Sequence, residues 1–212
     1  MSGNPHARVD GATIAIGGLT LVGCVLFAKA DLSDLEVGLF RAVNGLPGEL
    51  RTYVWPLMQY GTFITIPLLA LLAIAFRRPR LGLALLLAGV VVYLLALVVK
   101  EIVDRGRPAA LVDGVHAREV FGPDSLGFPS GHAAVATALT VVVAAHLSRR
   151  WAIAAVAVAL VVLFGRMYVG AHLPLDLIGG AALGALAGGV ANLLVRPTPR
   201  SSNPRTPTAS AG

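Results

Sequence analysis

The sequence predicts an all-α integral membrane protein, and two features of its composition indicate this fold class. Of the 212 residues, 56% are hydrophobic and only 13% are charged, a balance that excludes a water-soluble globular domain. Glycine is abundant, with 24 residues, and small residues let helices pack closely in lipid. The net charge of +6 comes from basic residues at the ends of apolar stretches, not from a basic surface interleaved with aromatic residues, so no nucleic-acid partner is expected.

Six apolar stretches approach the length of about 20 residues that a helix needs to cross a hydrocarbon core about 30 Å thick. The fourth and fifth are short and reach full length only by including the polar segments 130–132 and 166–168. Polar residues inside a span require an explanation, and they point to function. The six predicted transmembrane helices cover residues 11–28, 54–76, 81–99, 133–147, 151–164 and 177–195.

The first stretch has an alternative interpretation as a signal peptide, because Arg8 precedes it and residues 28–30 resemble a cleavage site. Its apolar run exceeds the usual length of about 7 to 15 residues, which favours a retained helix. Residues 1–195 are therefore predicted to form one six-helix membrane domain. Residues 196–212 are rich in Pro, Ser, Thr and Arg and are predicted to form a disordered basic cytoplasmic tail. The single cysteine, Cys24, excludes a disulfide framework.

The distribution of basic residues predicts the orientation of the six spans. With a cytoplasmic N-terminus, nine of the 17 basic residues and one of the 11 acidic residues, Asp10, face the cytoplasm. Both termini are then cytoplasmic, and the two polar loops at 101–128 and 165–176 lie outside. The segment after the first span begins with acidic residues. Apolar and polar residues then alternate in a pattern that predicts a short interfacial helix.

Two polar clusters flank the long outer loop, and each has an ordinary structural explanation when taken alone. In KEIVDRGRP, Lys100 can snorkel from the end of the third span, while Arg105 and Arg107 can anchor the interface. In PSGH, Ser130 is a plausible N-cap for the fourth span. His132, one turn further on, can be a hydrogen-bonded interfacial histidine.

The third cluster, GRMYVGAHLPLD, is harder to explain structurally. Arg166 is a charged residue near the end of a span, and such residues usually mark function or a buried partner. His172 and Asp176 are separated by four residues, with Pro174 suited to the first turn of a helix. This spacing lets the carboxylate reach the imidazole.

Together the three clusters predict a phosphoryl-transfer site on the outer face. Arginine and lysine donors suit the oxygens of a phosphoryl group, and a helix start at Ser130 and Gly131 adds backbone donors. An imidazole held by a carboxylate is a nucleophile or base. A second imidazole without such a partner is available as a general acid.

The motifs resemble the three-part signature of the type 2 phosphatidic acid phosphatase superfamily, a family that includes six-helix membrane lipid phosphatases. The resemblance implies that His172 attacks phosphorus, that Asp176 orients its ring and that His132 protonates the leaving oxygen. It also implies a phosphohistidine intermediate without a metal or other cofactor. One departure is Gly165, where the family usually has serine. The matching segments are Lys100-x6-Arg107-Pro108, Pro129-Ser130-Gly131-His132 and Arg166-x5-His172-x3-Asp176, and the expected phosphate-binding residues are Lys100, Arg107, Ser130, Gly131 and Arg166.

Resemblance to small bacterial members implies a bacterial plasma-membrane enzyme acting on undecaprenyl or another polyprenyl diphosphate, without indicating an oligomeric state. Phosphatidic acid and phosphatidylglycerol phosphate are alternative substrates. A non-catalytic lipid-phosphate transporter or binder is the competing class, although a binder needs cations and not a nucleophile with an acid. A vanadate-binding haloperoxidase would share the motifs but not six apolar spans. His6, His116 and His146 are expected to lie outside the site.

Overall fold

The computed structural model describes residues 5–122 and 125–196, and within these ranges the chain folds into helices and connecting loops without β-strands. Two short 3-10 turns, η1 (Gly48–Leu50) and η2 (Gln59–Gly61), flank the third helix. The α-helices are α1 (Pro5–Ala28), α2 (Asp34–Asn44), α3 (Arg51–Met58), α4 (Thr65–Ala75), α5 (Pro79–Val103), α6 (Pro108–Leu111), α7 (Gly131–His146), α8 (Arg149–Tyr168) and α9 (Pro174–Val195).

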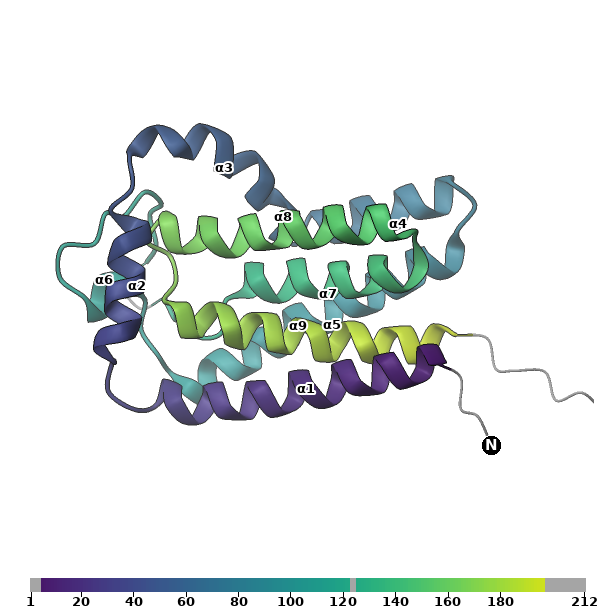
Figure 1. The fold of residues 1–212 in the computed structure, drawn as a ribbon, viewed down its shortest axis with the longest axis horizontal. Helices are drawn as coiled ribbons and strands as arrows, with labels where there is room; N and C mark the ends of the chain where they lie inside the picture. Colours follow the sequence, from purple (N-terminus) through teal and green to yellow (C-terminus); the bar gives the residue numbers. More distant parts are fainter. Residues whose placement is uncertain (1–4, 123–124, 197–212) are drawn as a thin grey trace, which may run out of the picture.

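The long helices run side by side along one axis, and the short helices α2 and α6 lie at one end of the bundle (Figure 1). At this end, called the α2 end below, α2 and α6 lie across the tips of α1, α5, α7, α8 and α9. The other end, called the α4–α5 end, holds the turn between α4 and α5, the turn between α7 and α8, and the start of α1. The C-terminus of α9 also lies there, beside the start of α1, where Arg196 contacts Asp10 at 2.6 Å.

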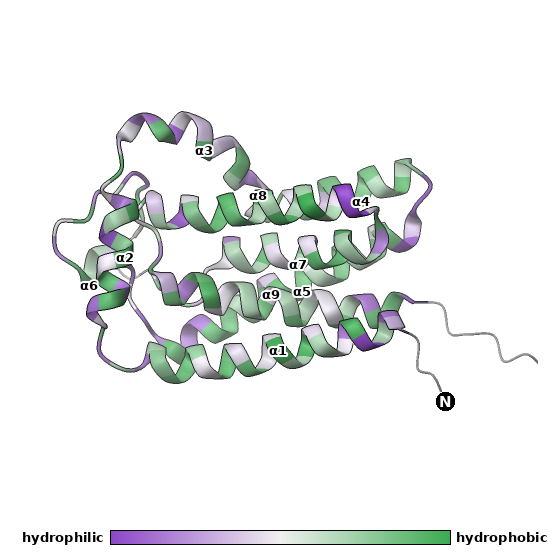
Figure 2. Cartoon of the chain, viewed as in Figure 1, coloured by the Kyte–Doolittle hydropathy of each residue, from purple (hydrophilic) through white to green (hydrophobic). Residues whose placement is uncertain are grey.

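The core of the bundle is built around α7, which packs against α5, α8 and α9. Small side chains allow this close packing: a Cβ atom added at Gly180 or Gly184 of α9 would overlap the backbone carbonyl of Ser130 or Ala134 in or beside α7. The outer faces remain apolar and exposed, as at Leu72 of α4 and Leu160 of α8. Hydrophobic residues cover the long helices, while hydrophilic residues concentrate at the bundle ends (Figure 2). This pattern fits a bundle surrounded by lipid.

Among the described residues, four helices are long and apolar enough to cross a membrane, namely α1, α5, α8 and α9. A fifth crossing is possible if the bent unit formed by residues 48–61 and α4 is one span. Helix α7 is apolar but has only 16 residues. Helix α7 begins at Gly131 and therefore includes residues 131–132 of the polar segment 130–132. Helix α8 ends at Tyr168 and includes the whole polar segment 166–168.

The span predicted over 54–76 is not one straight helix, because the chain bends by 69° between η2 and α4. The Gln59 carbonyl at the bend accepts hydrogen bonds from the hydroxyls of Thr62, at 2.7 Å, and Thr65, at 2.6 Å. The same carbonyl accepts from the Thr62 amide at 3.0 Å, so three groups of the turn satisfy it where the helix stops. The turn brings Gly61 so close to the His132 carbonyl that a Cβ atom there would lie 2.6 Å from the oxygen.

The interfacial helix expected after the first span is α2. The Ser33 side chain accepts a hydrogen bond from the Glu36 amide and caps its start. Phe40 is buried against the loop that follows α6 and against Leu173. Because α2 lies across the α2 end, it contacts α8 and the start of α9. The predicted tail, apart from Arg196, lies outside the described residues.

Candidate active site

A cavity of about 420 Å³ opens at the α2 end, between the ends of α5, α7 and α8. Six of the eight site residues predicted from the sequence line it. The acidic residue Glu119 and the aromatic residues Trp55, Tyr93 and Phe121 also line it. The six predicted residues in its wall are Lys100, Arg107, Gly131, His132, Arg166 and His172.

Converging helix ends bring these residues together from distant parts of the chain. Lys100 lies in the last turn of α5, and Arg166 lies in the last turn of α8. His132 lies in the first turn of α7, and His172 follows α8 in the loop before α9. Each polar residue thus sits where an apolar helix ends, which lets the charged groups meet in one cavity while the apolar stretches face lipid.

His172 is the most buried titratable side chain in the cavity wall, with a relative exposure of 2%. Its Nε2 atom lies 3.5 Å from the Arg107 guanidinium. Burial holds the pKa of His172 well below its usual value, and the nearby charges of Arg166, Arg107 and Lys100 lower it further. At neutral pH the imidazole is therefore uncharged and has a lone pair available for attack on an electrophile.

Asp176 is fully buried beneath the cavity and does not line it. Its Oδ2 atom lies 3.7 Å from His172 Nδ1, so the two residues meet as their spacing predicts, although this contact is longer than a hydrogen bond. The Asp176 carboxylate accepts its hydrogen bonds from two other groups. Arg105 donates to Oδ1 at 2.9 Å, and the Leu173 amide donates to Oδ2 at 2.8 Å.

Arg105 connects Asp176 to α2 and was not among the predicted site residues. Its guanidinium also donates to both carboxylate oxygens of Glu36, at 3.2 and 2.7 Å. Glu36 in turn accepts a hydrogen bond from the Leu175 amide at the start of α9, at 3.0 Å. Burial works to lower the pKa of Arg105, but the hydrogen bonds and charges of Glu36 and Asp176 outweigh it and raise that pKa. A fixed cation thus holds two carboxylates together.

The sequence signal for this network was present but ambiguous. The sequence alone suggests that Arg105 anchors the interface and that the acidic residues after the first span, Glu36 among them, start a short helix. Glu36 does lie in the first turn of α2. Only 11% of its side chain is exposed, because α2 crosses the bundle end above α9.

Lys100 and Arg107 are held by the long loop that precedes α7. The Lys100 ammonium donates to the Leu126 carbonyl at 2.8 Å. Arg107 donates to the Ser125 hydroxyl and to the Ala171 carbonyl, both at 2.9 Å, and its guanidinium lies 4.0 Å from the centre of the Phe121 ring. Burial, together with the charge of Arg166, lowers the pKa of Arg107 to about 10. Arg107 therefore stays a cation at neutral pH.

Arg166 has a carboxylate partner that the sequence analysis did not identify. Its guanidinium donates to Glu119 at 2.7 Å. Glu119 belongs to the same long loop and lines the cavity, and 22% of its side chain is exposed. The Glu119 carboxylate therefore occupies an N–H donor of Arg166, the arginine that is expected to bind phosphate.

Ser130, one of the predicted phosphate-binding residues, does not line the cavity. Ser130 is completely buried, and its hydroxyl accepts from the Ala133 amide as the N-cap of α7, outside the cavity wall.

Gly165, where the family usually has serine, lies where α3 packs against α8. A Cβ atom there would come within 2.6 Å of the Met58 and Val54 side chains, so a serine fits only if these side chains move. Met58 itself lines the cavity, in the region that a serine side chain at this position would approach.

His116 and His146 take structural positions, as expected from the sequence. The His116 amide donates to the Asn44 side chain at 2.8 Å, which ties the long loop to the end of α2. His146 lies at the C-terminal end of α7, with Nδ1 3.0 Å from the Val142 carbonyl. In the part of the chain that the structure describes, no three His, Cys, Asp or Glu side chains are grouped as metal ligands would be.

Residues 79–199, which contain all eight predicted site residues, match the PAP2 superfamily. The chain belongs to the PAP2 superfamily. This PAP2 protein is 32% identical over 152 residues to the undecaprenyl-diphosphatase of Sulfolobus acidocaldarius, and the match covers 71% of this chain and 73% of that protein.

Two solved structures share the fold of this PAP2 protein. LpxE of Aquifex aeolicus matches with a TM-score of 0.70 and 24% identity, over 77% of this chain and 99% of LpxE. The PAP2-type phosphatidylglycerolphosphate phosphatase of Bacillus subtilis matches with a TM-score of 0.65 and 22% identity, over 84% and 95%. Family and relatives together make this PAP2 protein a membrane lipid phosphatase, a hydrolase that acts on phosphoric esters.

Proposed function

We propose that the protein hydrolyses a polyprenyl diphosphate, such as undecaprenyl diphosphate, to the monophosphate and phosphate through a phosphohistidine at His172, with no metal ion. The observation that carries the mechanism is the position of His172, which is buried, uncharged and surrounded by three cations. Lys100, Arg107 and Arg166 supply the positive field that a divalent cation supplies in other phosphatases.

In the first step the Nε2 lone pair of His172 attacks the terminal phosphorus, so that a P–N bond forms as the P–O bond to the lipid phosphate breaks. The bonding electrons leave with the lipid oxygen, and His132 supplies the proton that this oxygen needs. Lys100, Arg107 and Arg166, with the amide of Gly131, balance the charge on the phosphoryl oxygens. Ser130 contributes through its N-cap, which fixes the start of α7.

In the second step water attacks phosphorus, the P–N bond breaks and His172 is regenerated. His132, now without its proton, takes one from the attacking water. Asp176 keeps the His172 loop in place through Leu173 and favours the transient positive charge on the imidazole. Each residue of the signature then has a role that the geometry supports.

The substrate choice rests on the relative from Sulfolobus acidocaldarius, whose name states an action on undecaprenyl diphosphate. Phosphatidic acid and phosphatidylglycerol phosphate remain the alternatives, the latter supported by the name of the Bacillus subtilis structure. The His172, Asp176 and His132 arrangement favours an enzyme over a lipid-phosphate transporter, because binding alone requires only the cations.

The substrate is tested by phosphate release from the purified protein with all three lipids, measured for the native protein and for His132→Ala. A lipid monophosphate leaving a diphosphate has a pKa of about 6 and departs with little assistance. The alkoxide leaving phosphatidic acid needs a proton, so loss of the general acid costs about 10²- to 10⁴-fold. We expect the diphosphate to be hydrolysed fastest and to lose the least activity in His132→Ala. Faster hydrolysis of a phosphomonoester would instead assign the substrate to the alternatives.

The proposal includes six membrane crossings in a bacterial plasma membrane, with both termini cytoplasmic and the active site outside. The bent unit of α3 and α4 and the short α7 supply the two crossings beyond α1, α5, α8 and α9. The arginines at 77, 78, 80, 149 and 150 lie in the α4–α5 turn or in the first turns of α5 and α8, all at the α4–α5 end, which the positive-inside rule places in the cytoplasm.

Cysteine labelling of intact cells tests this orientation in a Cys24→Ala background. Val120 is fully exposed in the loop at the α2 end, and Arg80 is exposed at the α4–α5 end. We expect a membrane-impermeant maleimide to label Val120→Cys in intact cells and Arg80→Cys only after lysis. The reverse pattern would place the active site in the cytoplasm.

A further inference from the structure

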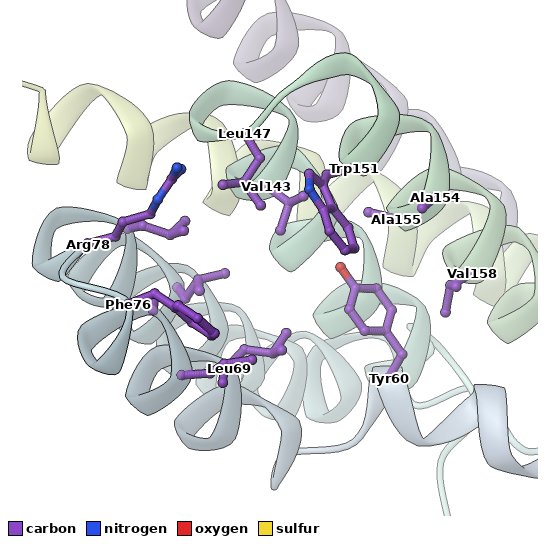
Figure 3. A pocket seen from close by; sticks show the side chains of 14 residues that line it. Tyr60, Leu69, Phe76, Arg78, Val143, Leu147, Trp151, Ala154, Ala155 and Val158 are labelled. Atoms are coloured by element: carbon purple, nitrogen blue, oxygen red, sulfur yellow. The ribbon is translucent and has the colours of Figure 1, made fainter.

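A second and larger cavity lies at the α4–α5 end, where no step of the proposed reaction takes place. Its volume is about 700 Å³, within the usual range of about 300 to 1,000 Å³ for ligand sites. Helix α4 with the start of α5 forms one wall, and the ends of α7 and α8 that meet at their turn form the other (Figure 3).

The interior of this cavity, called the α4–α8 groove below, is almost entirely apolar. Leu69 of α4 and Phe76, which directly follows it, lie across the groove from Val143 of α7 and Val158 of α8 (Figure 3). Leu72, Leu147 and Ala154 complete this apolar lining. No acidic residue is part of its lining. Leu72 and Phe76 are exposed in a bundle whose outer faces contact lipid, so the groove is accessible to lipid chains. The apolar lining of the groove is therefore suited to binding a hydrocarbon chain.

The mouth of the groove has the opposite character, because it carries arginines. Arg78 lines the groove and also an adjoining cavity of about 350 Å³, to which Arg77, Arg80 and His146 contribute. Within residues 5–122 and 125–196, none of these three arginines forms an ion pair. Three unpaired cations beside an apolar groove are complementary to a molecule with an anionic head and a hydrocarbon tail.

We propose that the α4–α8 groove binds an anionic phospholipid, with an acyl chain in the groove and the phosphate against Arg78. Arg77 and Arg80 strengthen the attraction for the anionic headgroup from the adjoining cavity. Trp151 and Tyr60 also line the groove, and each carries a polar group on an apolar ring (Figure 3). The ligand class is therefore a lipid with a net negative headgroup, such as phosphatidylglycerol.

This lipid is distinct from the substrate of the active site. Arg78 immediately precedes α5, whereas Lys100 lies in its last turn. At a rise of about 1.5 Å per residue, the two cations are about 33 Å apart along the helix. A phosphate bound at Arg78 therefore cannot be the phosphate that reaches His172. The groove is a separate lipid site at the opposite end of the bundle.

Tryptophan fluorescence measures occupancy of the groove without depending on catalysis. The chain has two tryptophans, Trp55 in the active-site cavity and Trp151 in the groove, so Trp55→Phe leaves Trp151 as the only tryptophan. The protein is reconstituted in phosphatidylcholine vesicles that contain an increasing fraction of phosphatidylglycerol. Bromine on the acyl chains of either lipid then reports which lipid lies next to Trp151.

We expect brominated phosphatidylglycerol to quench Trp151 with about fivefold higher apparent affinity than brominated phosphatidylcholine, the preference that one arginine near a membrane surface provides. Arg78→Gln should remove most of this preference, because Arg77 and Arg80 remain only in the adjoining cavity. Arg149→Gln removes the same charge at the same end of the bundle but lines neither cavity, so it should leave the preference intact. Equal quenching by both lipids, or an equal loss in both variants, overturns the proposal.

Ala154→Phe tests whether the chain occupies the groove itself. This substitution places a ring in the groove without changing charge, at an exposed position on α8 that tolerates a larger side chain. We expect it to lower quenching by brominated phosphatidylglycerol. Unchanged quenching would mean that the lipid lies on the outer surface and that the groove is not its site.

Discussion

Two arginine–carboxylate pairs support the active site, and they differ in how they are built. Arg105 and Asp176 are joined at 2.9 Å, with side-chain exposures of 6% and 0%. Arg166 and Glu119 are joined at 2.7 Å, but Glu119 lies in the long loop and has an exposure of 22%. The bond lengths are similar, whereas burial and connection to the rest of the fold are not.

Because of this difference, we call Arg105–Asp176 the fixed pair and Arg166–Glu119 the exchangeable pair, in which another anion can replace the carboxylate. Removing one partner of a buried pair leaves an uncompensated charge, which costs about 3 to 5 kcal/mol. Asp176 is further held by Leu173, and Arg105 is further held by Glu36, so neither can leave. Glu119 has only its loop to hold it beside Arg166, and a phosphoryl oxygen offers this guanidinium the same kind of acceptor. We therefore expect substrate to displace Glu119 and to leave Asp176 in place.

The largest effect is expected from breaking the fixed pair with Arg105→Gln. Asp176 would lose its charged donor and the His172 loop its support, and a displacement of about 1 Å at a reacting group costs about 10²-fold in rate. We expect kcat to fall by about this factor with KM nearly unchanged, because Arg105 lies outside the cavity wall. Steady-state kinetics on the purified variant measure both constants.

Arg105→Lys is the matched variant, since it keeps the charge and shortens the reach. It should recover part of kcat, and a thermal unfolding curve should separate loss of rate from loss of fold. Arg105 is only a structural residue if kcat per folded molecule stays at the native value, or if the whole loss appears in KM.

A smaller effect of opposite sign is expected from the exchangeable pair. In Glu119→Gln the incoming anion no longer competes with a carboxylate for Arg166, a contact worth up to about 1 kcal/mol for a partly exposed pair. Inhibition by vanadate, a phosphate mimic, should therefore tighten by up to about fivefold. Glu49→Gln, an exposed acid outside the cavity, is the charge-matched control and should show no change. Weaker inhibition of Glu119→Gln would show that Glu119 assists binding.

The two pairs also show where sequence reasoning succeeds and where it stops. Lys100, His132 and Arg166 were predicted because each lies at the boundary of an apolar run, and a helix end is a local feature. Glu36 and Arg105 are 69 residues apart, and nothing local shows that they meet. Their contact depends on α2 lying across the bundle end, and Glu119 depends likewise on the path of a long loop.

The bend inside the second predicted span is hidden from the sequence for a related reason. Apolar content over 54–76 suggests one helix, but at the bend the Gln59 carbonyl accepts from the Thr62 amide and from two threonine hydroxyls. Gly165 was recognised as a departure from the family pattern without an explanation. The explanation lies in α3, whose Met58 fills the space beside it.

The most direct test of the account is rapid-quench trapping of a phosphoenzyme with a radiolabelled lipid diphosphate in excess EDTA. The native protein should form an acid-labile phosphoprotein at His172 within one turnover, and His172→Ala should form none. In His132→Ala, labelled protein should still form from the diphosphate. If turnover in EDTA is lost and returns only with added Mg²⁺ or Zn²⁺, or if His172→Ala still carries the acid-labile label, the metal-independent phosphohistidine mechanism is wrong.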